Sequence, residues 1–196
     1  MYKTLILGVL ASVLLVSCGI PADEQEQGIL FGSPKAPVEM IVYLDYQCPE
    51  CKQFHDNILP ALESAALSEG RLSLRLRDFP VIAGSNISHN AAWCAREIGT
   101  KEYRAFIGAL YANIDAQRIF QLKEIGNSLG FPKSFAECVD TEKYANVVST
   151  LKNKGRADNV VRTPTILLGK RRFNGASELF QVLEAVNEEL AKTPQN

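Results

Sequence analysis

The chain has 196 residues, of which 46% are hydrophobic and 22% are charged, and its formal net charge at pH 7 is −1. This length suits a single domain with a substantial hydrophobic core, and nothing in the sequence suggests a repeat or a second domain. The nearly neutral charge argues against the strong positive field of a nucleic-acid-binding protein and against a basic membrane-binding patch.

The first 17 residues have the features of a secretory signal peptide. Lys3 precedes an apolar run over residues 5–16, which is shorter than the about 20 apolar residues that a membrane-spanning helix needs. The sequence Leu15-Val16-Ser17-Cys18 resembles a bacterial lipobox, so we expect cleavage before Cys18 and attachment of a lipid to this cysteine. An ordinary signal peptide with a chance cysteine, or an uncleaved anchor, is the alternative.

Residues 18–27 are expected to form a lipidated N-terminus and a flexible tether. The segment 21–28 is polar and acidic and has no large apolar side chain, which is typical of a disordered linker. We expect one folded domain over residues 28–192, held near a membrane surface.

The first part of that domain has the pattern of a strand, a helix and a second strand. Residues 40–46 are rich in apolar and β-branched side chains, and residues 72–77 alternate apolar and polar side chains, so both segments predict strands. Apolar side chains recur at helical spacing over residues 54–62, and Gly70 ends this helix. The three elements predict a βαβ unit with parallel strands and a right-handed crossover.

Cys48-Pro49-Glu50-Cys51 lies where the first strand passes into the helix, and it predicts a redox-active dithiol. If Pro49 is the first helical residue, Cys48 lies among the free N–H groups of the helix N-terminus, where a thiolate is favoured. Cys48 is therefore the expected nucleophile, and Cys51 is expected to resolve the mixed disulfide. The alternative is half of a zinc site with His55 as a further ligand, although no fourth ligand is evident nearby. Otherwise we expect His55 to be a packed or hydrogen-bonded side chain.

Asp45, three residues before Cys48, has two interpretations. A partly buried carboxylate there would have a raised pKa and could relay the proton of Cys51 when Cys51 becomes the attacking thiol. Alternatively, Asp45 ends the strand and accepts backbone hydrogen bonds.

Residues from about 86 to 158 form a predicted helical block, because strand signals fade there and apolar residues recur at helical spacing. Once Cys18 is set aside, four of the five cysteines remain, and they allow three pairings. If Cys48 pairs with Cys51, Cys94 and Cys138 are left for a structural disulfide, which would persist in an oxidising compartment. Two separate buried thiols are the alternative.

The last part of the chain predicts a hairpin and a helix. Strand character returns at residues 165–168, a turn follows at residues 169–171, and residues 172–174 extend again. Apolar side chains share one face over residues 179–190, which predicts an amphipathic helix that a sheet could cover.

The order of these elements, with Cys-Pro-X-Cys followed much later by Thr163-Pro164-Thr165, is similar to the DsbA-like thioredoxin family over residues 28–190. Four short segments also resemble the family, namely residues 45–49, 77–80, 91–95 and 174–176. The resemblance implies an α/β thioredoxin fold with an inserted helical subdomain. It also implies that Pro164 is cis and packs against the active-site disulfide, and that Thr163 offers its backbone to an extended substrate segment.

Glu50 departs from the family pattern, because strongly oxidising members carry His or an aromatic residue between the cysteines. A carboxylate beside Cys48 disfavours the thiolate, so we expect a weaker oxidant than a His-bearing relative. Thr163, Pro49 and Glu50 are the residues expected to meet the substrate. Arg162 and the basic hairpin segment 168–171 are a second departure, expected near the substrate site. These basic residues would favour acidic peptides, unless they are only a solvated face.

The chain is thus expected to be an extracytoplasmic thiol:disulfide oxidoreductase, lipid-anchored on the periplasmic side or the cell surface of a bacterial membrane. It would exchange disulfides with cysteine-containing protein substrates without an organic or metal cofactor, and a membrane oxidase or reductase would recycle it. A reductase or isomerase is the alternative within this class. A lipoprotein that carries copper or zinc on Cys48, Cys51 and His55 is the alternative outside it.

Overall fold

The computed structural model describes residues 19–193, so the predicted signal peptide and Cys18 lie outside the described residues. A five-stranded sheet has the order β1-β3-β2-β4-β5. Its strands are β1 (Ile29–Gly32), β2 (Val38–Leu44), β3 (Leu72–Asp78), β4 (Thr165–Leu168) and β5 (Arg171–Asn174). β2 and β3 are parallel, as the βαβ prediction requires, and the other neighbouring pairs are antiparallel.

The α-helices are α1 (Ala22–Gln27), α2 (Pro49–Gln53), α3 (Leu59–Leu62), α4 (Asn86–Ile98), α5 (Thr100–Ala112), α6 (Ile119–Ser128), α7 (Lys133–Asp140), α8 (Ala145–Ala157) and α9 (Leu179–Ala191). Two π-helical turns, Phe54–Ile58 and Glu63–Leu67, follow α2 and α3 and make one continuous helical segment. Pro60 lies in this segment and has no N–H to donate, so the regular α-helical hydrogen bonds are interrupted there. A 3-10 turn, Ala176–Glu178, precedes α9.

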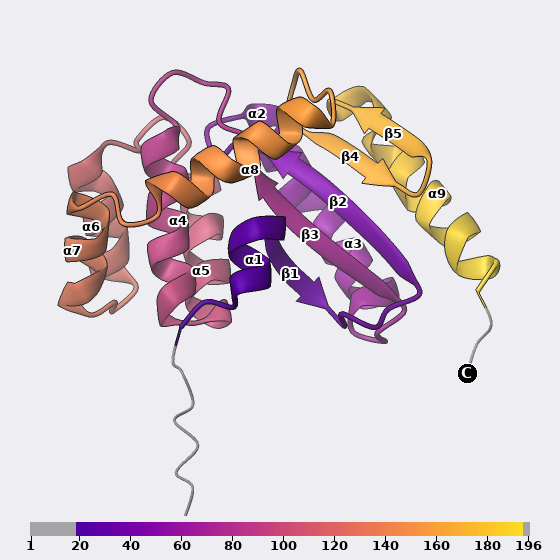
Figure 1. The fold of residues 1–196 in the computed structure, drawn as a ribbon, viewed down its shortest axis with the longest axis horizontal. Coiled ribbons are helices and arrows are strands. Elements are labelled where there is room, and N and C mark those ends of the chain that lie inside the picture. The colour runs from indigo at the N-terminus through magenta and orange to yellow at the C-terminus, as the bar shows by residue number, and fades with distance from the viewer. Residues whose placement is uncertain (1–18, 194–196) are drawn as a thin grey trace, which may run out of the picture.

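Helices cover both faces of the sheet (Figure 1). α8 crosses in front of the strands, α3 and α9 lie behind them, and α4 to α7 form a group beside the sheet. The five helices α4 to α8 connect β3 to β4, which matches the predicted helical block. α2 begins directly beyond the end of β2, between the sheet and this block, and the predicted dithiol lies at that point.

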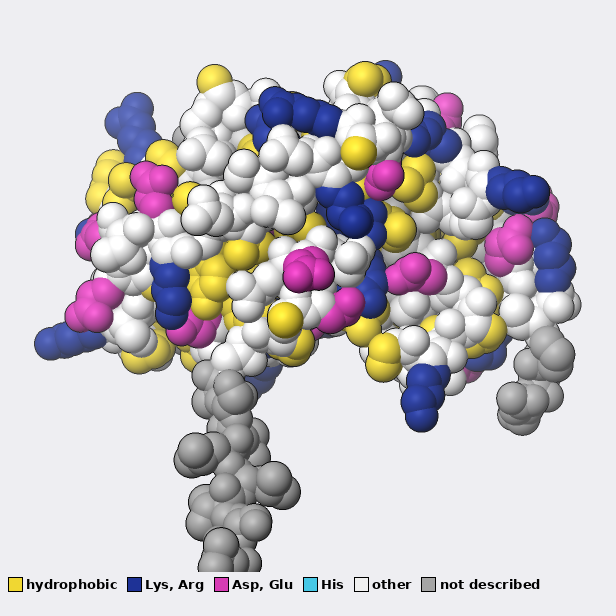
Figure 2. Space-filling view, in the orientation of Figure 1, with side chains coloured by type: hydrophobic (Ala, Val, Ile, Leu, Met, Phe, Trp, Pro, Cys, Tyr) yellow, Lys and Arg dark blue, Asp and Glu magenta, His cyan; other side chains and the backbone are white. Residues whose placement is uncertain are grey.

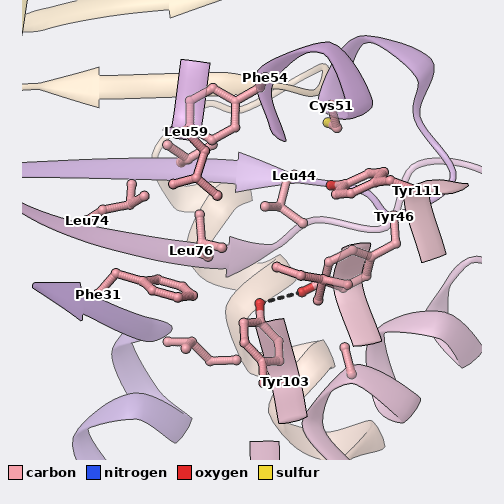
Figure 3. Packing of buried hydrophobic residues seen from close by; sticks show 14 of the residues in the cluster. Phe31, Leu44, Tyr46, Cys51, Phe54, Leu59, Leu74, Leu76, Tyr103 and Tyr111 are labelled. Carbon is pink, nitrogen blue, oxygen red and sulfur yellow. Dashed lines mark hydrogen bonds between the residues drawn. The ribbon is translucent and has the colours of Figure 1, made fainter. Parts of the chain in front are cut away.

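The main core fills the space between the sheet and the helices (Figure 3). Its buried side chains come from all five strands and from most of the helices. Those labelled in Figure 3 include Phe31, Leu44, Leu74, Leu76, Phe54, Leu59 and Tyr103. The hydroxyl groups of Tyr46 and Tyr103 form a hydrogen bond of 2.8 Å, which satisfies two buried polar groups. This bond joins the end of β2 to α5.

A disulfide joins Cys94 of α4 to Cys138 of α7, as the sequence predicts, while Cys48 and Cys51 are free thiols. The disulfide closes a loop with a sequence separation of 44 residues. In the chain-entropy model a loop of this size contributes about 4 kcal/mol to stability. The bridge therefore holds two helices of the inserted block together, away from the dithiol.

The segment before β1 differs from the predicted flexible tether. Residues 22–27 form α1, and the buried Glu24 pairs with Arg96 of α4 through contacts of 2.8 and 2.9 Å. Arg77 of β3 also donates to the carbonyl oxygen of Gln27 at 2.7 Å. The tether prediction is therefore wrong over residues 22–27, because these polar residues bind cations that are distant in the sequence.

The surface charge and the apolar character of the helices are two further features of the structure. On the face shown in Figure 2, side chains of Lys and Arg are interspersed with those of Asp and Glu, in keeping with the nearly neutral net charge. Among residues 19–193, no helix combines the length and the apolar character needed to cross a bilayer.

Candidate active site

Cys48 lies at the junction of β2 and α2. Its backbone is extended, and Pro49 is the first residue of the helix, as the sequence predicts. The N–H of Cys48 donates to the carbonyl oxygen of Asp45 at 3.1 Å and closes the turn that follows the strand. Only 8% of Cys48 is exposed, so a substrate sulfur must approach this one point of the surface.

The pKa of the Cys48 thiol is lowered to about 6, chiefly because the Cys51 thiol donates a hydrogen bond to the sulfur. Burial opposes this change, whereas the Thr163 side chain and the backbone N–H groups of Cys51 and Glu50 support it. At neutral pH Cys48 is therefore mainly a thiolate, which is the reactive form in disulfide exchange.

Cys51 has the opposite character. Its side chain is completely buried, and burial raises its pKa well above the ordinary value, as does the neighbouring Cys48. The N–H of Asp45 contacts its sulfur at 3.4 Å. An acidic thiol that just reaches the surface, beside a completely buried and weakly acidic thiol, is the arrangement that a nucleophile and a resolving thiol need.

The peptide bond between Thr163 and Pro164 is cis, as the family resemblance implies. In its thiol form, Cys48 donates a hydrogen bond to the carbonyl oxygen of Thr163 at 3.4 Å. The Thr163 hydroxyl is buried and has no hydrogen-bond partner among residues 19–193. It is therefore free to donate to a Cys48 thiolate.

The Glu50 carboxylate turns toward the segment after β5. Its Oε2 atom accepts a hydrogen bond from the N–H of Ala176 at 3.3 Å and lies 3.9 Å from Nη2 of Arg162. The backbone N–H of Glu50, in contrast, helps to lower the pKa of Cys48. The carboxylate does not prevent a low pKa at Cys48, and the weaker oxidising power stays a prediction.

Asp45 is fully buried, but its pKa is lowered to about 2 rather than raised. Burial acts to raise the pKa, and it is outweighed by His89 and by backbone N–H groups that donate to the carboxylate. The expectation of a raised pKa is therefore wrong, and a carboxylate that stays ionised is a poor carrier for the proton of Cys51. The second interpretation, a strand-end residue that accepts backbone hydrogen bonds, is confirmed.

His55 is a packed side chain. Its Nδ1 atom contacts Asp56 Oδ1 at 2.8 Å, and its ring lies 4.9 Å from the ring of Tyr111. Within the part of the chain that the structure describes, no group of three or more Cys, His, Asp or Glu side chains has the arrangement of a metal site. No observation favours the copper or zinc alternative.

A groove of about 930 Å³ opens beside the dithiol. Gln47 and Pro49 form one side of it, Ile82 of the loop after β3 contributes to the lining, and Ile119 and Phe120 of α6 form the other side. Phe120 is 54% exposed, so a partly apolar surface lies next to Cys48.

The basic hairpin turn lies away from this groove. Leu168 pairs with Met40 near the start of β2, whereas Thr165 pairs with Tyr43 near the end that carries the dithiol. Arg171 forms an ion pair with Glu188 of α9 instead. The expectation that segment 168–171 lies near the substrate site is therefore wrong, and Arg162 alone of these basic residues lies beside Glu50.

The sequence patterns do not reveal two buried groups next to the dithiol. Tyr111 of α5 lies beside Cys51 (Figure 3), and burial together with Cys51 raises its pKa well above the ordinary value. His89 of α4 is fully buried between Asp45 and Asp78. A histidine within a run of small and apolar residues is the only signal that could have indicated such a cluster.

A protein-family model described as thioredoxin matches residues 24–188. Disulfide bond formation protein D of Bacillus subtilis (strain 168) is 22% identical over 171 residues, which cover 82% of this chain and 76% of the relative. Oxidised BdbD of Bacillus subtilis has a similar structure, with a TM-score of 0.73, 20% identity and coverage of 88% of this chain and 97% of BdbD. So does α-DsbA1 of Wolbachia pipientis, with a TM-score of 0.72, 21% identity and coverage of 83% and 90%.

Proposed function

The chain belongs to the thioredoxin family. We propose that it is a DsbA-like thiol:disulfide oxidoreductase that exchanges disulfides with cysteine-containing proteins outside the cytoplasm. The observation that carries this proposal is the contrast between Cys48, which lies at the helix N-terminus and has a lowered pKa, and Cys51, which is completely buried and has a raised pKa. A thiolate that forms at neutral pH is a good nucleophile and also a good leaving group. Cys51, the buried thiol next to Cys48, can attack a mixed disulfide at Cys48, so that a disulfide between Cys48 and Cys51 forms as the substrate leaves.

In the oxidative direction the reaction has two steps. A substrate thiolate attacks Cys48 Sγ, the bond between Cys48 and Cys51 breaks, and Cys51 takes up a proton. A second substrate thiolate then attacks the substrate sulfur of the mixed disulfide, the substrate disulfide forms, and Cys48 leaves as a thiolate. The substrate loses two electrons and the dithiol gains them, so a membrane oxidase or another redox partner must reoxidise the protein.

The residues around the dithiol suggest how a substrate binds. An extended segment can pair with the backbone at Thr163, on the side of the cis peptide bond. The groove beside Pro49 offers apolar surface to a neighbouring substrate side chain. The charges of Glu50 and Arg162 partly neutralise each other beside the dithiol, so we assign no preference for acidic peptides.

We also propose that Cys18 carries a lipid that anchors the protein to a membrane. The support is the lipobox-like sequence Leu15-Val16-Ser17-Cys18 after a short apolar run. Metabolic labelling with a fatty-acid analogue tests this part separately, because Cys18→Ala would abolish the label.

The test of the proposed function is the reduction potential of the Cys48–Cys51 couple, measured by equilibration with glutathione. Cys51→Ala should accumulate a mixed disulfide with a peptide that carries a disulfide, because the Cys48 thiolate attacks that bond, one peptide thiolate leaves and the resolving thiol is missing; Cys48→Ala should form none. A potential well above the glutathione poise indicates disulfide donation, whereas a thioredoxin-like potential indicates a reductase. The absence of any exchange by the unaltered protein would overturn the proposal.

A further inference from the structure

Three charged side chains are buried together behind the dithiol. Asp45 follows β2, Asp78 ends β3, and His89 lies on α4, and they are 0%, 4% and 0% exposed. Burying charges is costly unless they are paired. The cluster joins both central strands to the inserted helical block at the point where the active site is built.

His89 contacts both carboxylates. Its Nδ1 atom lies 2.5 Å from Asp78 Oδ1. Its Nε2 atom has no hydrogen-bond partner among residues 19–193 and lies 3.8 Å from Asp45 Oδ1, within ion-pair distance. The ring of Tyr46 covers the imidazole at a centroid distance of 4.5 Å. Burial acts to lower the pKa of His89, but the two carboxylates outweigh it and raise the pKa to about 9.

The Asp45 carboxylate accepts four hydrogen bonds. Its Oδ1 atom accepts from the N–H of Gln47 at 2.9 Å. Its Oδ2 atom accepts from the N–H groups of Val81 and Ile82 at 2.7 and 2.9 Å and from the Ser85 hydroxyl at 2.9 Å. Three of these partners are N–H groups that can only donate, so the ionised carboxylate, with its full acceptor capacity, fits this site better than the protonated acid.

The backbone of Asp45 holds both cysteines. Its N–H contacts Cys51 Sγ at 3.4 Å, and its carbonyl oxygen accepts from the N–H of Cys48 at 3.1 Å. The side chain thus fixes the turn before Cys48 to the loop after β3, while the main chain of the same residue positions the dithiol.

We propose that His89 is a positioning residue of the dithiol, a buried cation that holds the Asp45 carboxylate in place and thereby orients Cys48 and Cys51. This inference rests on the proposed function of the dithiol. Without the cation, Asp45 and Asp78 would be buried with no positive neighbour in the cluster, and one of them would take up a proton. A protonated Asp45 would lose acceptors, and the turn before Cys48 would relax.

The test compares His89→Gln with Glu24→Gln. Both variants break a buried ion pair, but Glu24 pairs with Arg96 on α1 and α4 and makes no contact with the dithiol cluster. Both should lower the thermal unfolding temperature. Only His89→Gln should raise the pH midpoint of Cys48 thiolate formation, by about one pH unit, with about tenfold less thiolate below that midpoint.

A double-mutant cycle shows whether His89 acts through Asp45. In an Asp45→Asn background, His89→Gln should change the Cys48 midpoint much less than in the unaltered protein. Ser85→Ala removes one hydrogen bond to Asp45 without changing any charge, so it gives a milder variant with a smaller shift in the same direction. It also keeps the test decisive if His89→Gln does not fold.

The proposal is overturned if His89→Gln and Ser85→Ala unfold at lower temperature but keep the Cys48 midpoint of the unaltered protein. An effect of His89→Gln that is undiminished in the Asp45→Asn background would overturn the route through Asp45. Thiolate titration needs no substrate, so this result is independent of whether the unaltered protein exchanges disulfides. A failure of exchange by the unaltered protein would instead count against the proposed function.

Discussion

The Thr163 hydroxyl is a buried group that acts on the pKa of Cys48. It has no hydrogen-bond partner among residues 19–193 while Cys48 is a thiol, and its side chain acts to lower the pKa of Cys48. A hydrogen bond to a charged group contributes about 1.5–3 kcal/mol. The hydroxyl therefore stabilises the thiolate, and with it the reduced form of the protein.

For Thr163→Val we expect the pH midpoint of Cys48 thiolate formation to rise from about 6 by about one unit. A lowered pKa stabilises the folded, reduced protein fully above the ordinary pKa of 9, and this contribution is lost as the pH falls through the folded value of about 6. A raised midpoint weakens that contribution, so the reduction potential should fall by about 30 mV for a tenfold change. Thiolate absorbance and glutathione equilibration measure the two quantities.

Thr165→Val is the matched control for this change. The Thr165 hydroxyl donates to the carbonyl oxygen of Arg162 at 2.8 Å and lies 3.2 Å from Asn174 Oδ1, so its loss should reduce stability and leave the thiolate midpoint unchanged. Equal midpoints in Thr163→Val and the unaltered protein would show that the Thr163 hydroxyl does not contact the thiolate.

At the residue scale, the sequence predicts the groups whose chemistry is local. Cys48, Pro49 and Cys51 lie in one short segment between a strand and a helix, so the sequence predicts that the pKa of Cys48 is lowered. The part that Thr163 adds comes from a residue distant in the sequence. The lowered pKa of Asp45 cannot be predicted in this way, because its direction depends on His89, which is distant in the sequence. A side chain's burial can be guessed from its neighbours, but its ionic partner cannot.

At the scale of single elements, Gly155 lets α8 pack directly against two aromatic side chains. Gly155 of α8 has no side chain, and a Cβ atom there would lie 2.5 Å from Cδ2 of Phe79 and 3.1 Å from Cε1 of Tyr43. Both aromatic rings are buried and pack against each other, so neither has free space to move into.

Gly155→Ala should therefore destabilise the protein by about 1–3 kcal/mol, because overpacking outweighs the gain of about 1 kcal/mol in helix propensity. Gly108→Ala in α5 is the control, since the nearest atom to its Cβ would be His55 Cε1 at 3.9 Å. That variant should be as stable as the unaltered protein or more stable. Urea unfolding measures both, and a stabilising Gly155→Ala would show that α8 does not lie against Phe79.

An element is predicted accurately where its own residues carry the pattern, and poorly where contacts with distant residues hold it. β3 and β4 agree with the predicted segments to within one residue, because alternating or continuous apolar residues mark them directly. β1 has only four residues and exists through its antiparallel pairing with β3, so no pattern within it predicts a strand. α1 is likewise held by residues far along the chain rather than by its own composition.

At the scale of the whole molecule, α1 connects parts that the chain order keeps apart. Glu24 forms an ion pair with Arg96 of the inserted block, and Asp23 forms one with Arg75 of β3 at 2.8 Å. The carbonyl oxygen of Gln27 accepts a hydrogen bond from the side chain of Arg77. Ile20, just before the helix, is 8% exposed and belongs to the main core. The N-terminal segment thus holds the sheet against the helical block and is not a flexible linker over residues 22–27.

A variant that begins at Gly28 should accordingly be less stable than one that begins at Gly19. It loses the burial of Ile20, worth about 1.5–3 kcal/mol, and it leaves Arg77 without its bond to Gln27. We expect a lower urea midpoint, and Glu24→Ala in the longer form should reproduce part of the loss. Identical urea midpoints for the two forms would instead support the prediction of a flexible tether. If α1 and Ile20 are docked and Cys18 is lipidated, Gly19 alone lies between the folded domain and the lipidated residue. The domain would then be held close to the membrane, and a redox partner would have to reach Cys48 while the domain stays in that position.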